Sequence, residues 1–529
     1  MNLKHKKLSA LLLFLFTPFV SIAQESNKKG LDDKINEAFK PIANWFEAVI
    51  LHDFPFTASL FGTGIPTIII LLVGGALFFT IYFGFVNIRH FPTAINTVRG
   101  KFDSLDKKDD NDNDTDGEVT HFQALATAVS GTVGNGNIAG VAMAIAIGGP
   151  GATFWMILCG LLGMSTKFVE CTLGVKYRDV GEDGTVYGGP MYYMTKGLKE
   201  IGFEKLGKFL AIVFAFLCIG ASFGGGNAAQ SNQAAVQLAN SFGMTGGSAR
   251  TIIGLIMMVF VGIIIIGGIK RIASVTEKIV PFMALMYIAA CLYIILTNIT
   301  FVDDAFGMII SQAFNPNAGL GGFLGVLVTG FRRAAFSNEA GAGSASIAHS
   351  AVKTRYPASE GLVALLEPFI DTVVICTLTA LVIIIFNGDS TVFDYGGQGG
   401  VVIIDGVPAE GASITAAAFS KYISFSGPFL TIAVVLFAVS TMISWSYYGL
   451  QSWIYVFGKS KAADLTYKII FLLFIVIGAA GDMSSVWGFS DAMILGLVFP
   501  NMIGLFFLFP KVKEELVKYT NAIAGLVKK

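Results

Sequence analysis

The sequence predicts an all-α, polytopic membrane protein of about 11 transmembrane helices, in which a 5+5 inverted repeat is preceded by one extra helix. Composition is the first observation behind this prediction. Of the residues, 54% are hydrophobic and only 14% are charged, whereas about a quarter of a soluble domain is charged. The second observation is a series of long apolar segments, and the third is an alternation of charge between the loops that join them.

Residues 1–24 are predicted to be a cleaved signal peptide. Basic residues at positions 4–7 precede a short apolar core at residues 11–20, and Ser21-Ile-Ala23 provides a cleavage pattern of small residues. The core is shorter than the roughly 20 residues that a spanning helix needs, which favours cleavage over an uncleaved anchor. Residues 25–63 are then expected to form an extracytoplasmic leader.

Hydropathy and loop charge predict the spans and their orientation. Loops after odd-numbered spans carry most of the Lys and Arg residues, whereas loops after even-numbered spans are short or acidic, as at Asp303 and Asp304. By the positive-inside rule, the mature chain begins outside and ends in the cytoplasm. The candidate spans are 64–87 (the extra helix), 121–147, 152–175, 208–238, 248–268, 274–297, 319–348, 361–386, 427–450, 465–482 and 489–510.

Residues 88–120 are predicted to be an acidic cytoplasmic loop. Its run Asp109–Asp116 alternates acidic and polar residues as a calcium-binding loop does, but it lacks the closing Glu of that pattern. A solvated linker is therefore the favoured interpretation.

The last ten spans divide into two five-helix units of opposite orientation. The first unit, residues 121–298, begins at the cytoplasm, and the second, residues 319–510, begins outside; residues 511–529 form a cytoplasmic tail. Such inverted repeats place a binding site at mid-membrane, between paired broken helices. The first segment of each unit should therefore contain a break.

Both first segments contain stretches that favour a break. Gly131–Gly140 places four glycines and two asparagines inside an apolar segment, and Thr329–Ser344 is again polar and rich in glycine. Unwound backbone is tolerated at membrane depth only where protein or a cavity surrounds it. The alternative for the first stretch is a helix interface of small residues. The occurrence of both stretches at corresponding positions favours a transport site.

Ionisable residues inside spans indicate function, because burying them in lipid is costly. Arg332, Arg333 and Glu339 lie in the second stretch, where a gate or a local structural Arg–Glu pair is favoured over ligand contact. Glu367 and Asp371 are four residues apart and so share a helical face. They could line an ion path or cap the start of a helix, and the sequence leaves both open.

Polar residues in two other spans are candidate ligands. Ser440 and Thr441 offer hydroxyl oxygens of the kind that hard cations prefer, although hydroxyls in helices also bond to the preceding turn. Trp445, one turn beyond Thr441, would face the same cavity. Gln230 follows Gly224–Gly226 and could line a pocket or join helices.

Four stretches of the sequence resemble the alanine or glycine:cation symporter family, also called sodium:alanine symporters. They are Gly131–Gly140, Gly148–Met156, Gly188–Tyr193 and Phe336–Ser344. The resemblance extends from roughly residue 60 to residue 510. It implies a leucine-transporter-type fold, sodium-coupled uptake of small neutral amino acids such as alanine and glycine, and a place in the bacterial inner (plasma) membrane.

The resemblance also implies roles for individual residues. The motif Gly134-Asn-Gly-Asn137 matches the end of the first broken helix, so amides near Asn135 and Gly136 are expected to bind the substrate carboxylate. The indole of Trp445 would restrict the substrate to alanine-sized side chains. The remaining expected substrate residues are Thr132, Asn137 and Gln230, with Thr329, Gly330 and Phe331 matched by position only; the expected sodium residues are Ser130, Val133, Phe437, Ser440 and Thr441.

Other classes of function find little support in the sequence. No His-Glu-x-x-His or Walker A motif occurs, so an enzyme is not expected, and zero net charge gives no sign of nucleic acid. The expected partners are a small neutral amino acid, Na⁺ as the coupling ion and the bilayer, with no obligate protein partner inferred. A proton-coupled or differently selective amino-acid transporter is the alternative, and a channel is less favoured because no filter loop is found.

Overall fold

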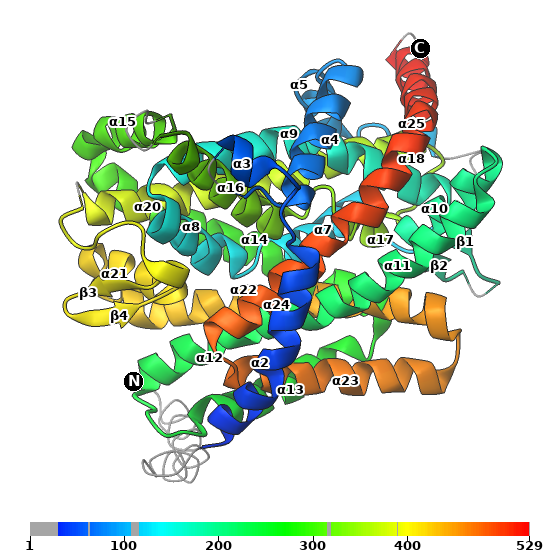
Figure 1. The fold of residues 1–529 in the computed structure, drawn as a ribbon. Helices are drawn as coiled ribbons and strands as arrows, with labels where there is room; N and C mark the ends of the chain where they lie inside the picture. Colours follow the sequence, from blue (N-terminus) through cyan, green and yellow to red (C-terminus); the bar gives the residue numbers. More distant parts are fainter. Residues whose placement is uncertain are drawn as a thin grey trace, which may run out of the picture.

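The structure is a computed structural model that describes residues 30–61, 64–106, 116–182, 184–314, 319–388 and 390–527. The predicted signal peptide, the first residues of the leader and nearly all of the run Asp109–Asp116 lie outside these residues. The described chain is mainly a bundle of long helices (Figure 1). Among the described residues, seven helices are long and apolar enough to cross a membrane, and three shorter ones are also apolar. The chain is therefore a multi-pass membrane protein.

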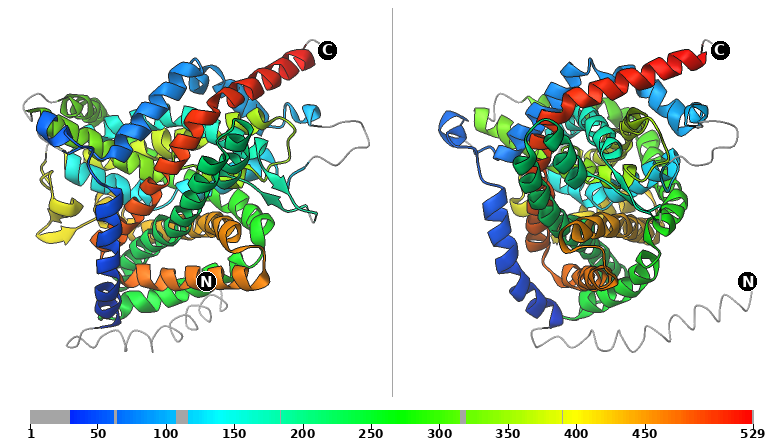
Figure 2. Two further views of the ribbon diagram at one scale, coloured as in Figure 1. Left: turned by 45° about the vertical axis from the view of Figure 1, so that its right-hand side comes forward. Right: turned by 90° about the vertical axis from the view of Figure 1, so that its right-hand side faces the viewer.

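The N-terminal part contains short helices and the predicted extra span. That span is α4, of 16 residues, and is shorter than the predicted 64–87 because Phe83 caps it and Gly84 and Phe85 turn the chain with positive φ. The preceding leader contains α2, which lies at the periphery of the bundle when the molecule is seen end-on (Figure 2, right). The elements are α2 (Leu31–Ile50), α3 (Thr57–Phe61), α4 (Thr67–Tyr82), α5 (Val86–Arg89), α6 (Phe91–Val98) and η1 (Asp103–Leu105).

The first predicted unit begins with a helix that is interrupted near its middle. Thr120 caps its start, where the Thr120 side chain accepts from the Gln123 N–H and Gln123 bonds back. The elements are α7 (His121–Thr132), η2 (Gly136–Gly140), α8 (Val141–Gly148), α9 (Gly151–Lys176), β1 (Asp179–Val180), β2 (Val186–Tyr187), α10 (Pro190–Glu200), α11 (Glu204–Phe223), η3 (Gly224–Ala228), α12 (Ala229–Phe242), α13 (Ala249–Ile265) and α14 (Gly268–Thr297).

The second predicted unit follows a short connection and also begins with an interrupted helix. The connection contains η4 (Ile299–Phe301) and α15 (Val302–Ala313). The predicted tail continues α25 as helix as far as Val527. The elements are α16 (Gly319–Asn338), α17 (Ala345–His349), α18 (Pro357–Ala364), α19 (Leu366–Pro368), η6 (Phe369–Cys376), α20 (Thr377–Asn387), η7 (Gln398–Gly400), β3 (Val402–Ile404), β4 (Val407–Ala409), α21 (Ala412–Tyr422), α22 (Ser426–Phe457), α23 (Lys461–Ala480), α24 (Met483–Gly496) and α25 (Val498–Val527).

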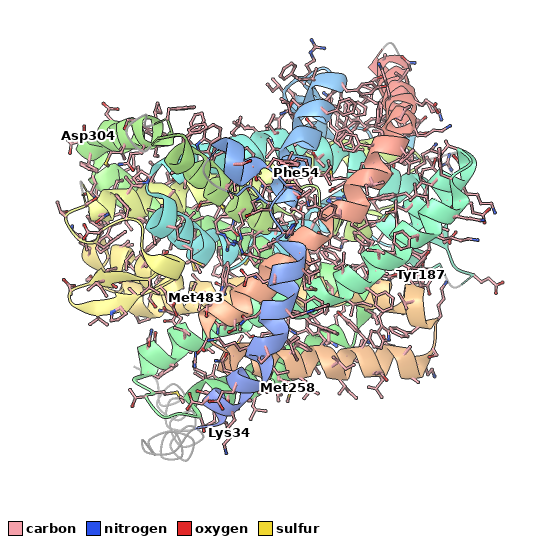
Figure 3. The ribbon with its side chains drawn as sticks, viewed as in Figure 1. Lys34, Phe54, Tyr187, Met258, Asp304 and Met483 are labelled. Atoms are coloured by element: carbon pink, nitrogen blue, oxygen red, sulfur yellow. The ribbon has the colours of Figure 1, made fainter. Side chains whose placement is uncertain are left out.

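Two antiparallel strand pairs mark opposite ends of the bundle. β1 pairs with β2 (Asp179 opposite Tyr187), and β3 pairs with β4 (Val402 opposite Ala409). Figure 1 shows β1 and β2 at the right and β3, β4 and α15 at the left, and Figure 3 shows Tyr187 far from Asp304. We call these ends the β1–β2 face and the β3–β4 face.

The loops on the two faces differ in charge. On the β1–β2 face, the Lys459 ammonium lies 3.4 Å from the centre of the Tyr187 ring, so the α22–α23 connection is on the same face as β2. On the opposite face, α15 begins with Asp303 and Asp304. The basic α22–α23 connection and the acidic start of α15 are thus on different faces, in agreement with the charge pattern used to orient the spans.

Helices approach one another closely at glycines in the interior. At Gly478 in α23, a Cβ atom would lie 2.4 Å from the Cα of Ala228 and 2.5 Å from the Ser231 hydroxyl. Close backbone contact of this kind is a main source of helix association in lipid, where apolar burial gives little driving force. The packing of α23 against η3 and α12 therefore depends on the absence of a side chain at Gly478.

We predict that Gly478→Ala destabilises the protein by about 1–3 kcal/mol, because backbone atoms would have to move apart. The matched control is Gly262→Ala in α13, where the nearest atom to a Cβ is 3.4 Å away. That substitution should leave the stability unchanged or raise it by up to about 1 kcal/mol, because alanine favours helix. Denaturant unfolding in detergent micelles measures both, and equal effects would contradict the packing argument.

Candidate functional site

The first break occurs inside the predicted stretch Gly131–Gly140. α7 ends at Thr132, Val133 leaves the helical conformation with ψ of 88°, and a π-helical turn from Gly136 to Gly140 precedes α8. Residues 132–140 are all buried. The structure thus places the break where the sequence predicts it, at the junction of Val133 and Gly134.

Side chains supply hydrogen bonds for the backbone that the first break exposes. The Gly134 N–H donates to Asn137 Oδ1 (2.9 Å), and the Asn135 N–H donates to Gln230 Oε1 (2.9 Å). The Gln230 amide in turn donates to the Gly225 carbonyl (2.9 Å). The predicted pocket residue Gln230 therefore binds the break itself, at the amide that is expected to bind the substrate carboxylate.

The second break lies at the end of the predicted stretch Thr329–Ser344. α16 continues as helix to Asn338, and the chain is non-helical from Glu339 to Ser344, where Glu339, Gly341 and Gly343 have φ of 56°, 95° and 82°. The positive φ at Gly341 and Gly343 suits glycine, which has no Cβ. At Glu339 it is strained for a residue with a side chain, as often occurs at functional sites.

The match of Thr329, Gly330 and Phe331 to the second break, made by position only, is therefore wrong. These residues lie within the continuous helix α16 and pack on α8 and α9. A Cβ at Gly330 would lie 2.6 Å from the Ala152 carbonyl oxygen, and the Phe331 ring lies 6.1 Å from that of Trp155. Helix packing against α9 explains why the chain stays helical here.

The second break also obtains its hydrogen bonds from distant helices. The Gly341 N–H donates to Glu170 Oε1 of α9 (2.9 Å), and Asn501 of α25 donates to both Glu170 Oε1 and the Gly341 carbonyl (2.8 Å each). The Glu339 carboxylate accepts from the hydroxyl of Ser344. Sequence reasoning missed Glu170 and Asn501. A carboxylate inside the apolar helix α9 was a signal that could have revealed Glu170.

Asp371 connects the two breaks. It lies in η6, a π-helical segment, and is fully buried. Asn137 of the first break donates to its Oδ1 (2.6 Å), and Ser337, just before the second break, donates to the same oxygen (3.1 Å). Asp371 could line an ion path or cap the start of a helix, and its contacts with both breaks favour a position on the ion path. Glu367 has other contacts, with Lys167 and His349, although it is only one turn away.

The arginines of the second stretch do not form the local pair considered from the sequence. Arg333 forms an ion pair with Asp491 of α24, and Arg332 lies 2.8 Å from the same carboxylate and 3.5 Å from Glu47 of α2. Asp491 was missed in the sequence, although it is also an acidic residue in an apolar segment. Both arginines therefore join α16 to neighbouring helices.

The predicted sodium residues of α7 and α22 are in direct contact. The Thr441 hydroxyl donates to the Ser130 carbonyl (3.0 Å), and the Ser130 hydroxyl donates to the Ser440 carbonyl (2.8 Å). Ser440 itself bonds back to the Phe437 carbonyl (3.0 Å), as the alternative reading of these hydroxyls expects. Val133 is buried at the end of the same stretch. The donors are uncharged oxygen atoms, which suit a hard cation.

The remaining predicted substrate residues differ in whether they contact the breaks. Trp445 is fully buried, and its indole N–H donates to Glu339 Oε1 of the second break (2.9 Å). It also packs on η3, where a Cβ at Gly226 would lie 2.2 Å from its Cγ. The Thr132 hydroxyl bonds back to the Ala128 carbonyl (3.2 Å) and so is used within α7. Gly136 faces Phe336 and Ser337 of α16.

Many secondary transporters contain two broken helices that meet at buried polar groups inside the membrane. The two breaks of this chain have that arrangement. The pattern that defines the sodium:alanine symporter family matches residues 54–527. The chain belongs to the sodium:alanine symporter family.

Individual relatives cover most of the chain. It is 41% identical to the sodium/alanine symporter AgcS of Methanococcus maripaludis, over 85% of this chain and 93% of that protein. It is 34% identical to the probable sodium/glutamine symporter GlnT of Bacillus subtilis, over 86% of this chain and 88% of that protein. Among solved structures, it is similar to MhsT in complex with L-phenylalanine, with 16% identity, a TM-score of 0.48 and coverage of 75% of this chain and 100% of that one.

We predict that Trp445→Phe destabilises the folded protein by about 1–3 kcal/mol, because the buried Glu339 carboxylate would lose the indole N–H. The matched control is Trp453→Phe in the same helix, because the Trp453 indole N–H has no hydrogen-bond partner in the described residues. Thermal unfolding of the purified protein compares the two variants. A loss for Trp453→Phe as large as that for Trp445→Phe would contradict a specific role for the Glu339 contact.

Proposed function

We propose that this chain is a secondary active transporter that couples sodium to the uptake of small neutral amino acids, alanine and glycine among them, by alternating access. The contact that supports this most directly is made by α22. Thr441 bonds to the first break at Ser130, and Trp445, one helical turn further on, bonds to the second break at Glu339. A cation bound between Thr441 and Ser130 would therefore alter the position of Trp445, which contacts the second break.

The proposed site divides into an ion half and a substrate half. Sodium would bind the carbonyls of Ser130 and Val133 together with Thr441 and neighbouring oxygens of Phe437 and Ser440, which the resemblance to the family favours. Replacing the Thr441-to-Ser130 hydrogen bond by two ion–oxygen contacts requires little rearrangement, because the two oxygens are already 3.0 Å apart.

The substrate half would use the amides of the first break. An amino-acid carboxylate at the N–H groups of Asn135 and Gly136 would displace Gln230 from the Asn135 N–H, and Gln230 would then be free to bind the ligand. The positive end of the helix that follows the break favours an anion there. Asn137 adjoins this point, and the bulk of Trp445 would exclude large side chains.

Coupling follows when sodium binds the substrate-competent state more tightly than the alternative state, because a ligand with equal affinity for both shifts nothing. The orientation proposed from loop charge, in a bacterial inner membrane, places the β1–β2 face and the C-terminus in the cytoplasm. Sodium and amino acid would then enter from the β3–β4 face and leave at the β1–β2 face. The fold proposed is of leucine-transporter type, with two inverted five-helix units after α4.

The proposal predicts sodium-driven uptake of alanine by the purified full-length chain in proteoliposomes. An inward sodium gradient should concentrate labelled alanine, and potassium in its place should not. Unlabelled glycine should compete, whereas bulky amino acids should compete poorly. Uptake that is independent of the sodium gradient but follows a proton gradient would support the proton-coupled alternative and overturn sodium symport.

We further predict that Thr441→Val raises the sodium concentration for half-maximal uptake about tenfold or more, equivalent to about 1.4 kcal/mol of lost ion binding. Valine keeps the shape of threonine but has no oxygen. The control is Ser446→Ala in the same helix, whose hydroxyl donates only to the Ile443 carbonyl of its own helix among the contacts described (2.6 Å). An unchanged sodium requirement for Thr441→Val would exclude this residue from the ion site.

A further inference from the structure

Six charged or ionisable side chains form a continuous line from the β1–β2 face into the interior. The line, which we call the charge chain, runs in the order Asp106, His121, Glu360, His349, Glu367 and Lys167. Its successive contacts are His121 Nε2 to Asp106 (4.0 Å), His121 Nδ1 to Glu360, Glu360 to His349 Nδ1 (2.5 Å), His349 Nε2 to Glu367 (3.7 Å) and Glu367 to Lys167 (2.9 Å). None of these residues belongs to the proposed sodium or substrate site.

The geometry defines the charge of both histidines. Each imidazole has a carboxylate at both ring nitrogens: His121 lies between Asp106 and Glu360, and His349 lies between Glu360 and Glu367. A neutral imidazole would present a lone pair to one of the two carboxylates, whereas the imidazolium presents an N–H to each. The two carboxylates around each ring therefore favour the imidazolium form of both histidines in this conformation.

Burial makes these two protons necessary. The side chains of His349, Glu360, Glu367 and Lys167 are 0% exposed, and only Asp106 (18%) and His121 (10%) reach solvent. Buried charges persist only when they are paired. With both histidines protonated, negative and positive residues alternate along the chain and sum to zero. Without these protons, the buried carboxylates of Glu360 and Glu367 would have only Lys167 in direct contact as a counter-charge, with Arg178 further away.

The charge chain joins the segments that lie beyond both breaks on this face. His121 is the first residue of α7, His349 is the last residue of α17, and Glu360 in α18 bonds to both. The backbones of Val119 and Val352 also pair next to these contacts. Glu360 thus holds the outer ends of both broken helices together, so the β1–β2 face can open only if these contacts separate.

Other charged and polar groups near the histidines have hydrogen-bond partners other than the two histidines. Arg178 donates to the carbonyls of Ser350 (2.8 Å) and Val352 (2.5 Å), as well as to those of Asp116 and Thr354. Tyr519 bonds to Thr97 (3.0 Å). Glu170, on α9, accepts from the backbone of the second break. The backbone N–H of Arg355 donates to Asp106. Once they are released into water, the two histidines titrate near neutral pH.

We propose that His121, Glu360 and His349 form a proton-binding gate, which holds two protons when the β1–β2 face is closed and releases them when it opens. Asp106, at the surface, is where protons enter and leave. In the orientation proposed above this face is cytoplasmic, so cytoplasmic pH controls the release of the substrate. The inference rests on the proposed function for that last step only.

The direction of the pH effect follows from proton linkage. Histidines released into water titrate near pH 6.5, whereas those in the closed gate are held protonated by two carboxylates each. The closed state is therefore fully favoured below about pH 6.5, and it loses that advantage as the pH rises. Above this pH, the open-to-closed ratio should rise by up to about tenfold per pH unit if one proton is released. It should rise by up to about 100-fold per pH unit if two are released.

The test measures opening directly, without transport. Spin labels at Phe122→Cys on α7 and Val517→Cys on α25, both exposed positions, report their separation by pulsed EPR in nanodiscs without sodium or amino acid. The five native cysteines are buried, and the parent chain without added cysteines serves as the labelling blank. The longer-distance population should grow between pH 6.5 and pH 8.5.

Variants identify the groups responsible. In His121→Gln and in His349→Gln, the pH response should fall to that of one proton, about tenfold per unit at most, and Glu360→Gln should increase the open population at every pH. The control is His90→Gln, on a connection outside the charge chain, where burial and then Arg89 lower the pKa of the histidine. It should retain the full pH response.

The outcomes separate this proposal from the proposed function. A pH-independent distance in the parent chain, or a full pH response in both His121→Gln and His349→Gln, would overturn the gate. Unfolding curves for the same samples verify that each variant is folded. His121→Gln replaces the histidine nearer the surface, so it should disturb folding less than His349→Gln does. A normal pH response in a chain that fails to take up alanine with sodium would overturn the transport proposal and support the gate.

Discussion

The structure depends on one constraint: backbone that leaves the helical conformation inside a membrane must find hydrogen-bond partners within the protein. At the first break the partners are Asn137 and Gln230, and at the second they are Glu170 and Asn501. Each partner except Asn137 comes from a different helix from the break it serves. The breaks are therefore maintained by the surrounding bundle, and any ligand that replaces a partner also changes how the bundle packs.

Helix α22 and segment η6 each contact both breaks. α22 contacts each break through a different side chain, so a shift of this helix would alter both at once. Asp371 in η6 accepts from both sides of the gap between the breaks. A buried carboxylate is costly unless it receives several hydrogen bonds. Besides the bond from its neighbour Thr372, Asp371 receives those from Asn137 and Ser337 only while the two breaks stay together.

The sequence predicts local features better than contacts between distant segments. The helical membrane class and the break at Val133 follow from hydropathy and from clustered glycines, which act within a few residues. The second break was misplaced at Thr329–Phe331, because its position depends on Glu170 and Asn501, which are far away in the chain. The arginine partners were missed for the same reason: Arg332 and Arg333 pair with Asp491, and no local pattern indicates that pairing.

The two ends of the proposed transport path are held by chemically different ion pairs. Toward the β3–β4 face, α16 is joined to α24 by arginines, which stay charged at every physiological pH. Toward the β1–β2 face, α7 and α17 are joined to α18 by histidines, whose charge changes near neutrality. Since closure of one end must give way to closure of the other during alternating access, pH would shift the balance between the two states through one end alone. A fall in pH would then favour the state that is open toward the β3–β4 face.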